Sequence, residues 1–444
     1  MPFPVPTQAR QALDALHGAG FEAYLVGGCV RDSLLGTQPH DWDIATSALP
    51  GQTAAVFSGL PLCRAGEKHG TVTVCFPGLP VEITTFRLDG QYQDHRRPQS
   101  VAFSRSLRED LARRDFTINA MAWDGGLADP FGGRADLAAG LVRCVGDPQK
   151  RLEEDSLRIL RGLRFAAVLG FRLEKGTAQA MLEKKGLLRS LAAERVGEEF
   201  LRLLCGKNAA QVLREYRPVA EEFLPELAPM AGLDQKSTYH CFDVWEHTLH
   251  TLENTGPDPV LRLAALLHDV GKPACFTVDS AGRGHFYGHQ AKGAEMAVAI
   301  GRRLRLSRET AGQVETLVRY HDVSAVCGKP RVLRWLNRLG LPLYQKLLAL
   351  NRADTLAHSP AAFRRLAVLD QAEKELEEIL RENACFTLAQ LALKGGDLQG
   401  MAEGPALGRL LRRLLEAVMD GACPNEREAL LALARRLTAE VSHS

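Results

Sequence analysis

The stretch YLVGGCVRDSLLG at residues 24–36 decides the fold expected for the first part of the chain. Its order of residue types predicts a strand, a tight glycine turn and a short helix that begins near Val30. Gly27 and Gly28 let the backbone come close to a ligand, because neither carries a Cβ atom. The free N–H groups of the helix would face an anion such as a triphosphate, and Arg31 would add a charge-assisted contact. Alone, the same pattern is equally typical of an ordinary structural turn.

The segment HDWDIAT at residues 40–46 follows and brings two carboxylates together. In a strand, residues two apart share a face. Asp41 and Asp43 therefore point one way, while Trp42 and Ile44 point into the core. Two adjacent carboxylates repel each other unless a cation lies between them. A pair of divalent ions about 3.5–4 Å apart, which clamps a phosphoryl group in transfer, is what this geometry serves. The alternative is a solvated strand face without chemistry.

A third carboxylate is available on the strand expected at VEITTF, residues 81–86. Glu82 faces away from Val81 and Ile83, so it could join the aspartate pair. Taken alone, Glu82 is equally compatible with a solvated strand face.

Strand signals and helix signals are unevenly distributed along the chain. Short β-type runs with glycine breaks lie at residues 23–28, 41–46, 71–76 and 81–86. After about residue 150, long stretches rich in Leu, Ala, Arg and Glu have helical spacing. We therefore expect an α+β protein in which a small mixed-sheet head is followed by an all-α neck, body and tail. The expected ranges are 1–135 for the head, 136–205 for the neck, 206–360 for the body and 361–444 for the tail.

The bulk composition limits the class of protein. A chain of 444 residues with 45% hydrophobic content is expected to form roughly two to four domains. The formal net charge is only +2, so a nucleic-acid partner would have to meet local basic patches. Ten cysteines without a CxxC pair indicate reduced cytosolic thiols and not a disulfide framework. Neither a long apolar run nor an apolar signal core is present, so we expect a cytoplasmic protein without a membrane span.

Residues 152–169 have the spacing of one amphipathic helix. Its core stripe consists of Leu152, Ile159, Leu163 and Ala166. Asp155 and Arg158 lie three residues apart on a different face, where such a pair is usually a surface ion pair that contributes little. The functional alternative is an artificial base edge, because Arg offers donors and Asp offers acceptors that together match cytosine or adenine. Each good bidentate contact discriminates between bases by roughly 1–3 kcal/mol.

Five motifs occur in the order of a known family. They are GGCVRDSLLG with DWDIAT (27–36 and 41–46), RRDFTINAMAWD (113–124), ADPFGGRADL (128–137), RLEEDSLRILRGLRFA (151–166) and AAERVGEEF (192–200). Together they resemble the class II CCA-adding enzymes and bacterial poly(A) polymerases, which belong to the DNA polymerase beta-like nucleotidyltransferases. Five motifs in order over about 200 residues are hard to obtain by chance, so the chain is identified as a member of this family.

The resemblance implies a nucleotidyltransferase head that uses two Mg²⁺ ions. Asp41 and Asp43 would hold these catalytic metals, and Glu82 would assist. Arg114 and Asp115 would read the ribose and select ribonucleotides. The EDxxR pattern that contains Asp155 and Arg158 would be the family's protein template for the base. The full set implied to bind the nucleotide is Gly27, Gly28, Arg31, Arg114, Asp115, Asn119, Asp155, Arg158 and Arg161.

A long polar segment at residues 86–111 is typical of a mobile loop. From Arg87 to Asp115 the chain carries seven Arg against five acidic residues. The segment could be a plain surface excursion. Its portion DGQYQDHRRPQSV (89–101), however, resembles the flexible loop that CCA-adding enzymes carry and CC-adding enzymes lack. The resemblance therefore implies addition of both C and A.

A second constellation lies in the helical body. It consists of His247, His268, Asp269, His289, His321 and Asp354. An adjacent His-Asp pair at a helix end, with further His and Asp on neighbouring helices, suits one or two divalent transition-metal ions. A lone histidine is more often a core or surface residue, but six residues in this order resemble the HD superfamily of phosphohydrolases. In that resemblance, His289 and His321 match the extra ligands of two-metal members. It implies either an active phosphatase or phosphodiesterase, or a retained helical scaffold that grips tRNA.

These observations lead to three functional hypotheses. The first is transfer of CMP and AMP from CTP and ATP to the 3′ end of tRNA. The second is a poly(A) polymerase, which shares the head motifs, and the third is an HD phosphohydrolase whose head only binds RNA. Segment 301–338 carries nine Lys or Arg against three acidic residues, which suits either RNA phosphates or a solvated helix surface. The end of the chain from LKGGDLQG (393–400) onward resembles the tail of the same family and implies a tRNA contact.

Overall fold

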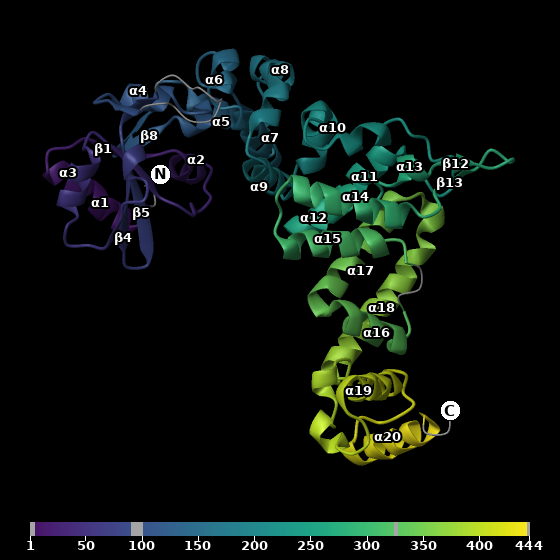
Figure 1. The fold of residues 1–444 in the computed structure, drawn as a ribbon. Coiled ribbons are helices and arrows are strands. Elements are labelled where there is room, and N and C mark those ends of the chain that lie inside the picture. Colours follow the sequence, from purple (N-terminus) through teal and green to yellow (C-terminus); the bar gives the residue numbers. More distant parts are fainter. Residues whose placement is uncertain (1–4, 90–100, 324–326, 442–444) are drawn as a thin grey trace. The chain divides into compact units, whose positions relative to one another are not determined.

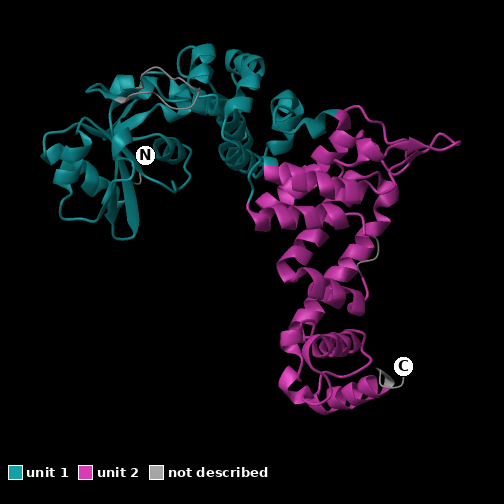
Figure 2. Ribbon diagram, in the orientation of Figure 1, with its two compact units in different colours: residues 1–228, 303–306 teal, residues 229–302, 307–444 magenta. Residues whose placement is uncertain are grey.

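A computed structural model describes residues 5–89, 101–323 and 327–441. The chain divides into two compact units (Figure 2). Unit 1 comprises residues 1–228 and 303–306, and unit 2 comprises residues 229–302 and 307–444. In the described part of the chain, no helix is long and apolar enough to cross a membrane. All ten cysteines are free thiols. The division into head, neck, body and tail stays a prediction.

Unit 1 begins with a mixed seven-stranded sheet, as predicted for the head (Figure 1). The strand order is β3-β4-β5-β2-β1-β8-β9, in which β2 runs parallel to β5 and the other neighbours are antiparallel. The strands are β1 (Ala23–Val26), β2 (Asp43–Thr46), β3 (Leu62–Cys63), β4 (Thr71–Phe76), β5 (Leu79–Thr85), β8 (Ala122–Asp124) and β9 (Gly126–Ala128). All four expected strands are present. Asp41 precedes β2 instead of lying within it, which corrects the prediction for that strand.

Alternation of side chains along β4 and β5 builds the core face of this sheet. Val72, Val74, Val81 and Ile83 are buried, whereas Glu82 is exposed, as predicted. Helices α1 and α3 pack on the sheet. The head helices are α1 (Thr7–Gly18), α2 (Gly28–Leu34), α3 (Pro50–Val56), α4 (Leu107–Ala112) and α5 (Gly133–Ala139). Helix α2 begins two residues earlier than the sequence suggested, directly after the turn at Gly27.

A separate pair of short strands, β6 (Arg87–Asp89) and β7 (Val101–Phe103), brackets the predicted loop. Their antiparallel register pairs Asp89 with Val101, so the two ends of this segment lie side by side. Residues 90–100, which make up most of the stretch that resembles the family's flexible loop, lie outside the described residues.

Five further helices follow in unit 1. They are α6 (Pro148–Glu154), α7 (Leu157–Leu169), α8 (Lys175–Lys184), α9 (Ala193–Leu204) and α10 (Ala209–Ala220), joined by the parallel strands β10 (Leu141–Val142) and β11 (Arg172–Leu173). The prediction of one helix over 152–169 is wrong, because the helix breaks at Asp155, whose backbone is extended (φ −139°, ψ 100°). The Asp155 carboxylate accepts a hydrogen bond from the Leu157 N–H at 3.1 Å, and such a cap competes with helix continuation. The predicted core stripe is buried nonetheless.

Unit 2 consists mainly of helices (Figure 1). They are α11 (Val244–Glu253), α12 (Pro259–Leu267), α13 (Lys272–Cys275), α14 (His289–Arg303), α15 (Arg308–Tyr320), α16 (Lys329–Leu339), α17 (Leu341–Ala357), α18 (Arg364–Arg381), α19 (Gly404–Met419) and α20 (Arg427–Val441). The strands β12 (Thr277–Val278) and β13 (Gly284–His285) form a small hairpin that projects from the body. Helix α11 packs against α17, and α12 packs against α15. Helix α12 is buried along most of its length, so the His-Asp pair that follows it is buried too.

The tail shares a hydrophobic core with α17, the helix that carries Asp354. Tyr344 and Leu348 of α17 belong to the same cluster as Leu414 of α19 and Leu430 of α20. Burial of these side chains against one another fixes the first half of α17, whereas Asp354 lies near the C-terminal end of the same helix.

Candidate functional site

Three carboxylates meet at one end of strands β2 and β5. The parallel register places Asp43 opposite Glu82, and Asp41 lies two residues before Asp43. Trp42 and Ile44 are buried beneath them, as the alternation in the sequence predicted. The sheet therefore brings Glu82 next to the aspartate pair, although it lies about 40 positions later in the chain.

Asp43 is the most perturbed member of this group. Burial, followed by the charge of Glu82, raises the pKa of Asp43 to about 6, and the charge of Asp41 acts in the same direction. Arg114 opposes the shift. Like charges held this closely are relieved by a bound proton or a bound cation. Because carboxylate oxygens are the ligands that Mg²⁺ prefers, the donor set fits a hard divalent ion.

Gly27 lets Arg114 reach this carboxylate group. Its backbone has φ of 76°, a conformation that side chains rarely adopt. A Cβ atom at this position would lie 3.1 Å from Nη1 of Arg114 and 3.9 Å from Oδ2 of Asp43. The turn predicted from sequence is thus also the point where the arginine of the second motif meets the aspartate of the first.

Four of the predicted nucleotide-binding residues form a continuous polar network. Arg31 donates from Nη1 to Oδ1 of Asn119 (2.7 Å), and Asn119 donates from Nδ2 to Oδ1 of Asp115 (3.0 Å). Arg161 donates from Nε and Nη2 to Oδ2 of Asp115 at 2.8 and 2.6 Å. Burial by itself raises the pKa of Asp115, but Arg161 and Asn119 hold it well below its usual range. Asp115 is therefore a fixed anion that orients Arg161 and Asn119, and its predicted contact with the ribose stays a prediction.

Asp155 and Arg158 do not share a helical face, so the geometry expected for this pair is wrong. Arg158 is buried and donates to the carbonyls of Arg151 and Arg113 and to Oε2 of Glu154, each at 2.9 Å. Asp155 lies in the break between α6 and α7, 3.7 Å from Nη2 of Arg195. The pair is consequently neither a simple ion pair nor an assembled base edge in this conformation, and its role in base selection stays a prediction.

Two residues that organise the arginines around this network, Phe165 and Glu199, were not predicted from the sequence. The ring of Phe165 collects three guanidinium groups, those of Arg31, Arg161 and Arg164, whose Cζ atoms lie 5.0, 5.5 and 4.4 Å from its centroid. Glu199 is buried, and its Oε2 forms an ion pair with Nε of Arg164 at 2.8 Å. Both residues lie inside the motifs quoted above. In the sequence, however, an aromatic residue at helical spacing looks like an ordinary core residue, and an acidic residue looks like an ordinary surface residue.

The six predicted metal ligands of the body converge and are all buried. They form two groups whose ligand atoms lie within 4.8 Å of one another: His247, His268 and Asp354, and Asp269, His289 and His321. Nε2 of His247 lies 2.9 Å from Oδ1 of Asp354, and Nε2 of His268 lies 3.1 Å from Oδ2 of Asp269. Charged side chains are seldom buried together unless they are paired or bind a metal.

Backbone carbonyls fix the orientation of three of these histidines. His268, His289 and His321 each direct Nδ1 at the carbonyl oxygen three residues earlier, at 2.8, 2.8 and 2.7 Å. Because a carbonyl only accepts hydrogen bonds, the proton lies on Nδ1 and a neutral ring offers a lone pair at Nε2. Nε2 of His289 and Nε2 of His321 nevertheless face each other at 3.3 Å. Two opposed lone pairs require a cation or a proton between them.

Asp269 gives the same indication. Both of its carboxylate oxygens are buried and accept no hydrogen bond in the described part of the chain, although Lys272 lies 2.7 Å away. Burial lowers the pKa of His247 and of His289, which favours the neutral rings that bind metals. This set of imidazole and carboxylate donors fits one or two divalent transition-metal ions.

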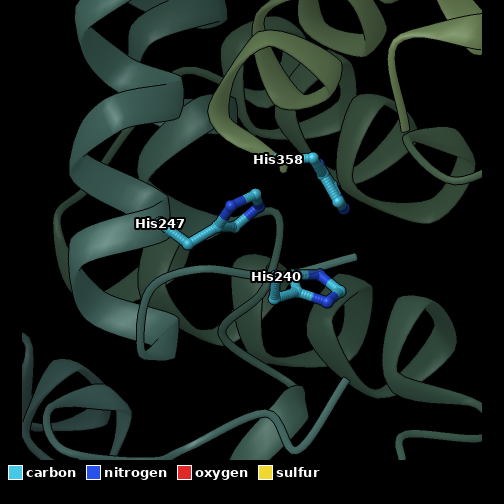
Figure 3. Close-up of side chains that lie close together, drawn as sticks. All are labelled: His240, His247 and His358. Carbon is cyan, nitrogen blue, oxygen red and sulfur yellow. The ribbon is translucent and has the colours of Figure 1, made fainter. Parts of the chain in front are cut away.

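Two further histidines, His240 and His358, lie beside His247 and were not predicted (Figure 3). The ring centroid of His358 lies 4.4 Å from that of His240 and 4.7 Å from that of His247. His358 directs Nδ1 at the Asp354 carbonyl oxygen at 2.7 Å, the same arrangement as in the predicted ligands. Each is an isolated histidine in the sequence, so nothing there distinguishes it from a surface residue.

Four family models match this chain, and different models cover the head and the body. The Poly A polymerase head domain matches residues 23–143, and the RNA and SrmB-binding site of polymerase A matches residues 170–230. The HD domain matches residues 238–357, and the tRNA nucleotidyltransferase domain 2 matches residues 299–434. The three carboxylates of the head and the six His and Asp residues of the body thus lie inside matched regions, whereas Asp155, Arg158 and Arg161 lie between two of them.

Whole-chain similarities extend further. The chain is 36% identical to a CCA-adding enzyme of Limosilactobacillus fermentum over 97% of this chain and 96% of the relative. It is 49% identical to a CCA-adding enzyme of Geobacillus thermodenitrificans over 46% of this chain and 51% of that relative. Among solved structures, the Bacillus stearothermophilus CCA-adding enzyme in complex with CTP matches with a TM-score of 0.69 and 30% identity, over 98% of both chains. The chain therefore belongs to the CCA-adding enzyme family.

Proposed function

We propose that this chain adds the CCA sequence to the 3′ end of tRNA, taking CMP from CTP and AMP from ATP. The meeting of Asp41, Asp43 and Glu82 beside the turn at Gly27 carries the proposal. A group of carboxylates next to a backbone that a phosphate can approach suits phosphoryl transfer. Similarity to CCA-adding enzymes over 97% of the chain supports CCA addition above poly(A) addition. The related enzyme solved with CTP supports that nucleotide as a substrate.

The reacting groups are held by residues from both catalytic strands. Asp41 and Asp43 would bind Mg²⁺, with Glu82 in support. Two ions held by these carboxylates would polarise the triphosphate and favour ionisation of the attacking hydroxyl. Asp43, with a pKa of about 6, is ionised at neutral pH and ready to bind a cation. Arg114, which already offsets the charge of Asp43, is placed to hold the triphosphate next to it.

Base selection requires Arg158 to exchange partners. Its donors are directed at Glu154 and at backbone carbonyls, so an incoming base has to replace at least one of these acceptors. Exchange of one hydrogen bond for another is close to neutral in free energy, so the base can compete. Asp155, at the helix break, is free of helical constraint and completes the edge with acceptors once it leaves Arg195.

Asp41→Asn and Asp43→Asn should each lower the rate of CMP and AMP addition by about a thousandfold or more, because each removes a metal ligand from the transition state. The Kd for tRNA should change by less than about threefold, since neither carboxylate binds RNA in this scheme. Single-turnover assays and filter binding with end-truncated tRNA measure both quantities. Asp124→Asn, an exposed carboxylate of β8 in the same sheet, is the matched control. Addition within about tenfold of the parent in Asp43→Asn would contradict the assignment.

Asp155→Ala should reduce discrimination among the four nucleotides by about tenfold or more, and it should lower the free energy of unfolding by about 0.5–2 kcal/mol, because it removes the cap on the Leu157 N–H. Arg158→Ala should reduce discrimination similarly and also lower the free energy of unfolding by about 1–3 kcal/mol, since it leaves buried acceptors unpaired. Incorporation assays with each triphosphate and urea unfolding separate the two effects. Glu153→Ala, in α6 two residues before Asp155, removes an exposed ion pair with Lys184 and is the control. Unchanged selectivity in both variants would assign the pair to structure alone.

We also propose a second activity in the body, the metal-dependent hydrolysis of phosphate esters. The facing Nε2 atoms of His289 and His321, and the unsatisfied oxygens of Asp269, support it. A divalent ion bound there supplies an activated water molecule. The six His and Asp residues of the cluster would hold that ion, and Lys272 offers a positive charge beside Asp269.

The full-length Asp41→Asn protein should retain a divalent transition metal through gel filtration and release phosphate from p-nitrophenyl phosphate. His268→Ala should lose the metal and the phosphatase activity, while CCA addition stays within about threefold of the parent. Elemental analysis and phosphate release measure these effects, and His250→Ala, on the same helix as His247, is the control. If the Asp41→Asn protein retains no metal and releases no phosphate, the proposed hydrolase activity is contradicted and the body serves only as a scaffold.

A further inference from the structure

Both ends of the polar network around Asp115 return to one aromatic ring. Phe165 lies on α7, and only 6% of it is exposed. The Cζ atoms of Arg31 and Arg161 lie 5.0 and 5.5 Å from the centroid of its ring. These two arginines are also the two ends of the hydrogen-bonded series that runs through Asn119 and Asp115. The ring of Phe165 therefore closes a circle of contacts that joins α2 to α7.

The ring of Phe165 is held in place from a second direction. Phe116, which is fully buried and follows Asp115 in the chain, packs edge-on against it, with a centroid separation of 5.8 Å and an interplanar angle of 81°. Gly162 makes room for Phe116, because a Cβ atom at Gly162 would lie 3.0 Å from Cζ of Phe116. Edge-to-face pairs are a favoured arrangement of aromatic rings. The ring is therefore a fixed support for the arginines around it.

Positive charge accumulates around this ring. A third guanidinium, that of Arg164, has its Cζ atom 4.4 Å from the ring centroid, and its Nε atom lies 2.8 Å from Oε2 of Glu199. The negative face of an aromatic ring attracts cations, and the attraction is strongest where water is excluded. Phe165 thus opposes the mutual repulsion of the guanidiniums without occupying any of their N–H donors. An acidic residue in its place would bind those donors itself.

Arg161 keeps donors for a ligand in this arrangement. Its Nε and Nη2 atoms donate to Asp115, whereas its Nη1 atom lies 3.9 Å from Oε1 of Glu199, beyond hydrogen-bonding distance. Within residues 5–89, 101–323 and 327–441, no oxygen accepts a hydrogen bond from Nη1 of Arg161. The N–H groups of Nη1 can therefore donate to the oxygens of an anion, and charge-assisted bonds of this kind suit phosphate groups.

We propose that Phe165 is a positioning residue for nucleotide addition. Its ring holds Arg31 and Arg161 in the orientation that binds the triphosphate of the incoming nucleotide. Phe165 is buried and carries no polar group, so it acts on the nucleotide through these two arginines. The inference rests on the proposed CCA addition and adds to it the side chain that arranges the phosphate-binding cations. Because CTP and ATP share the triphosphate, loss of the ring affects both substrates alike and leaves the choice of base unchanged.

Kinetics with CTP and with ATP on end-truncated tRNA test this role in the full-length protein. Phe165→Leu should raise the KM for each nucleotide about tenfold, which corresponds to about 1.4 kcal/mol, and leave kcat within about threefold of the parent. Phe165→Tyr, which keeps the ring, should restore each KM to within about threefold of the parent. Discrimination among the nucleotides should stay as in the parent for both variants, because neither changes a contact with the base.

Phe57→Leu controls for the loss of a buried aromatic ring. Phe57 is 5% exposed and packs edge-on against Phe76, with a centroid separation of 6.1 Å and an interplanar angle of 76°. In the described part of the chain, no lysine or arginine lies over its ring. Phe57→Leu should lose about as much stability in urea as Phe165→Leu and keep the KM of the parent.

Fluorinated phenylalanines at position 165 separate the charge of the ring from its packing. Each added fluorine weakens the negative face of the ring at nearly constant shape, so the KM for both nucleotides should rise step by step. This series also replaces Phe165→Leu if that variant does not fold. An unchanged KM across the series would mean that the ring only fills the core, and it would overturn the inference.

Binding of inorganic triphosphate with Mg²⁺ and without tRNA separates this inference from the proposed CCA addition. Calorimetric titration should give a Kd about tenfold weaker for Phe165→Leu than for the parent, and an unchanged Kd for Phe57→Leu. If the parent adds no nucleotide but this difference is present, the CCA proposal fails and positioning by Phe165 stands. If the parent and Phe165→Leu bind triphosphate equally, or the parent binds none, the inference is overturned, whether or not CCA is added.

Discussion

Repulsion among Asp41, Asp43 and Glu82 is the constraint around which the head is built. Parallel pairing of β2 with β5 brings two of these carboxylates into register, and burial of Asp43 raises their energy further. Other features of the site offset this repulsion. Gly27 lets Arg114 approach, and polar contacts from Arg31 to Asp115 hold further arginines nearby. In the proposed mechanism, a divalent cation that binds together with the triphosphate would relieve this repulsion.

The same logic recurs in the body with different donors. There the unfavourable features are the facing Nε2 lone pairs of His289 and His321 and the buried carboxylate of Asp269, which accepts no hydrogen bond from the described residues. The carbonyl contacts at Nδ1 keep His268, His289 and His321 from turning away, as supporting hydrogen bonds do in many metal sites. One chain therefore contains a group of oxygen donors that suits a hard cation and a group of nitrogen and oxygen donors that suits a transition metal. The tail stabilises the second by packing on α17.

Period-two alternation predicted that Asp41 and Asp43 face away from the buried Trp42 and Ile44, because strand geometry is local. It did not predict the parallel pairing of β2 with β5 that places Glu82 opposite Asp43. The uneven distribution of strand and helix signals likewise predicted the α+β class, and the ordered His and Asp residues of the body predicted its cluster. The break at Asp155 was not predictable from periodicity, since it depends on a side-chain cap that replaces one backbone hydrogen bond. Phe165, Glu199, His240 and His358 were missed because their role arises from contacts between distant helices, which no local spacing encodes.

The product ladder of a tRNA that lacks its last three nucleotides tests the central claim most directly. The labelled tRNA is incubated with CTP alone, with ATP alone and with both, and the products are resolved at single-nucleotide resolution. The account predicts addition of two nucleotides with CTP, none with ATP alone, and three nucleotides followed by termination with both. A long tract of A from ATP alone would identify a poly(A) polymerase and contradict it.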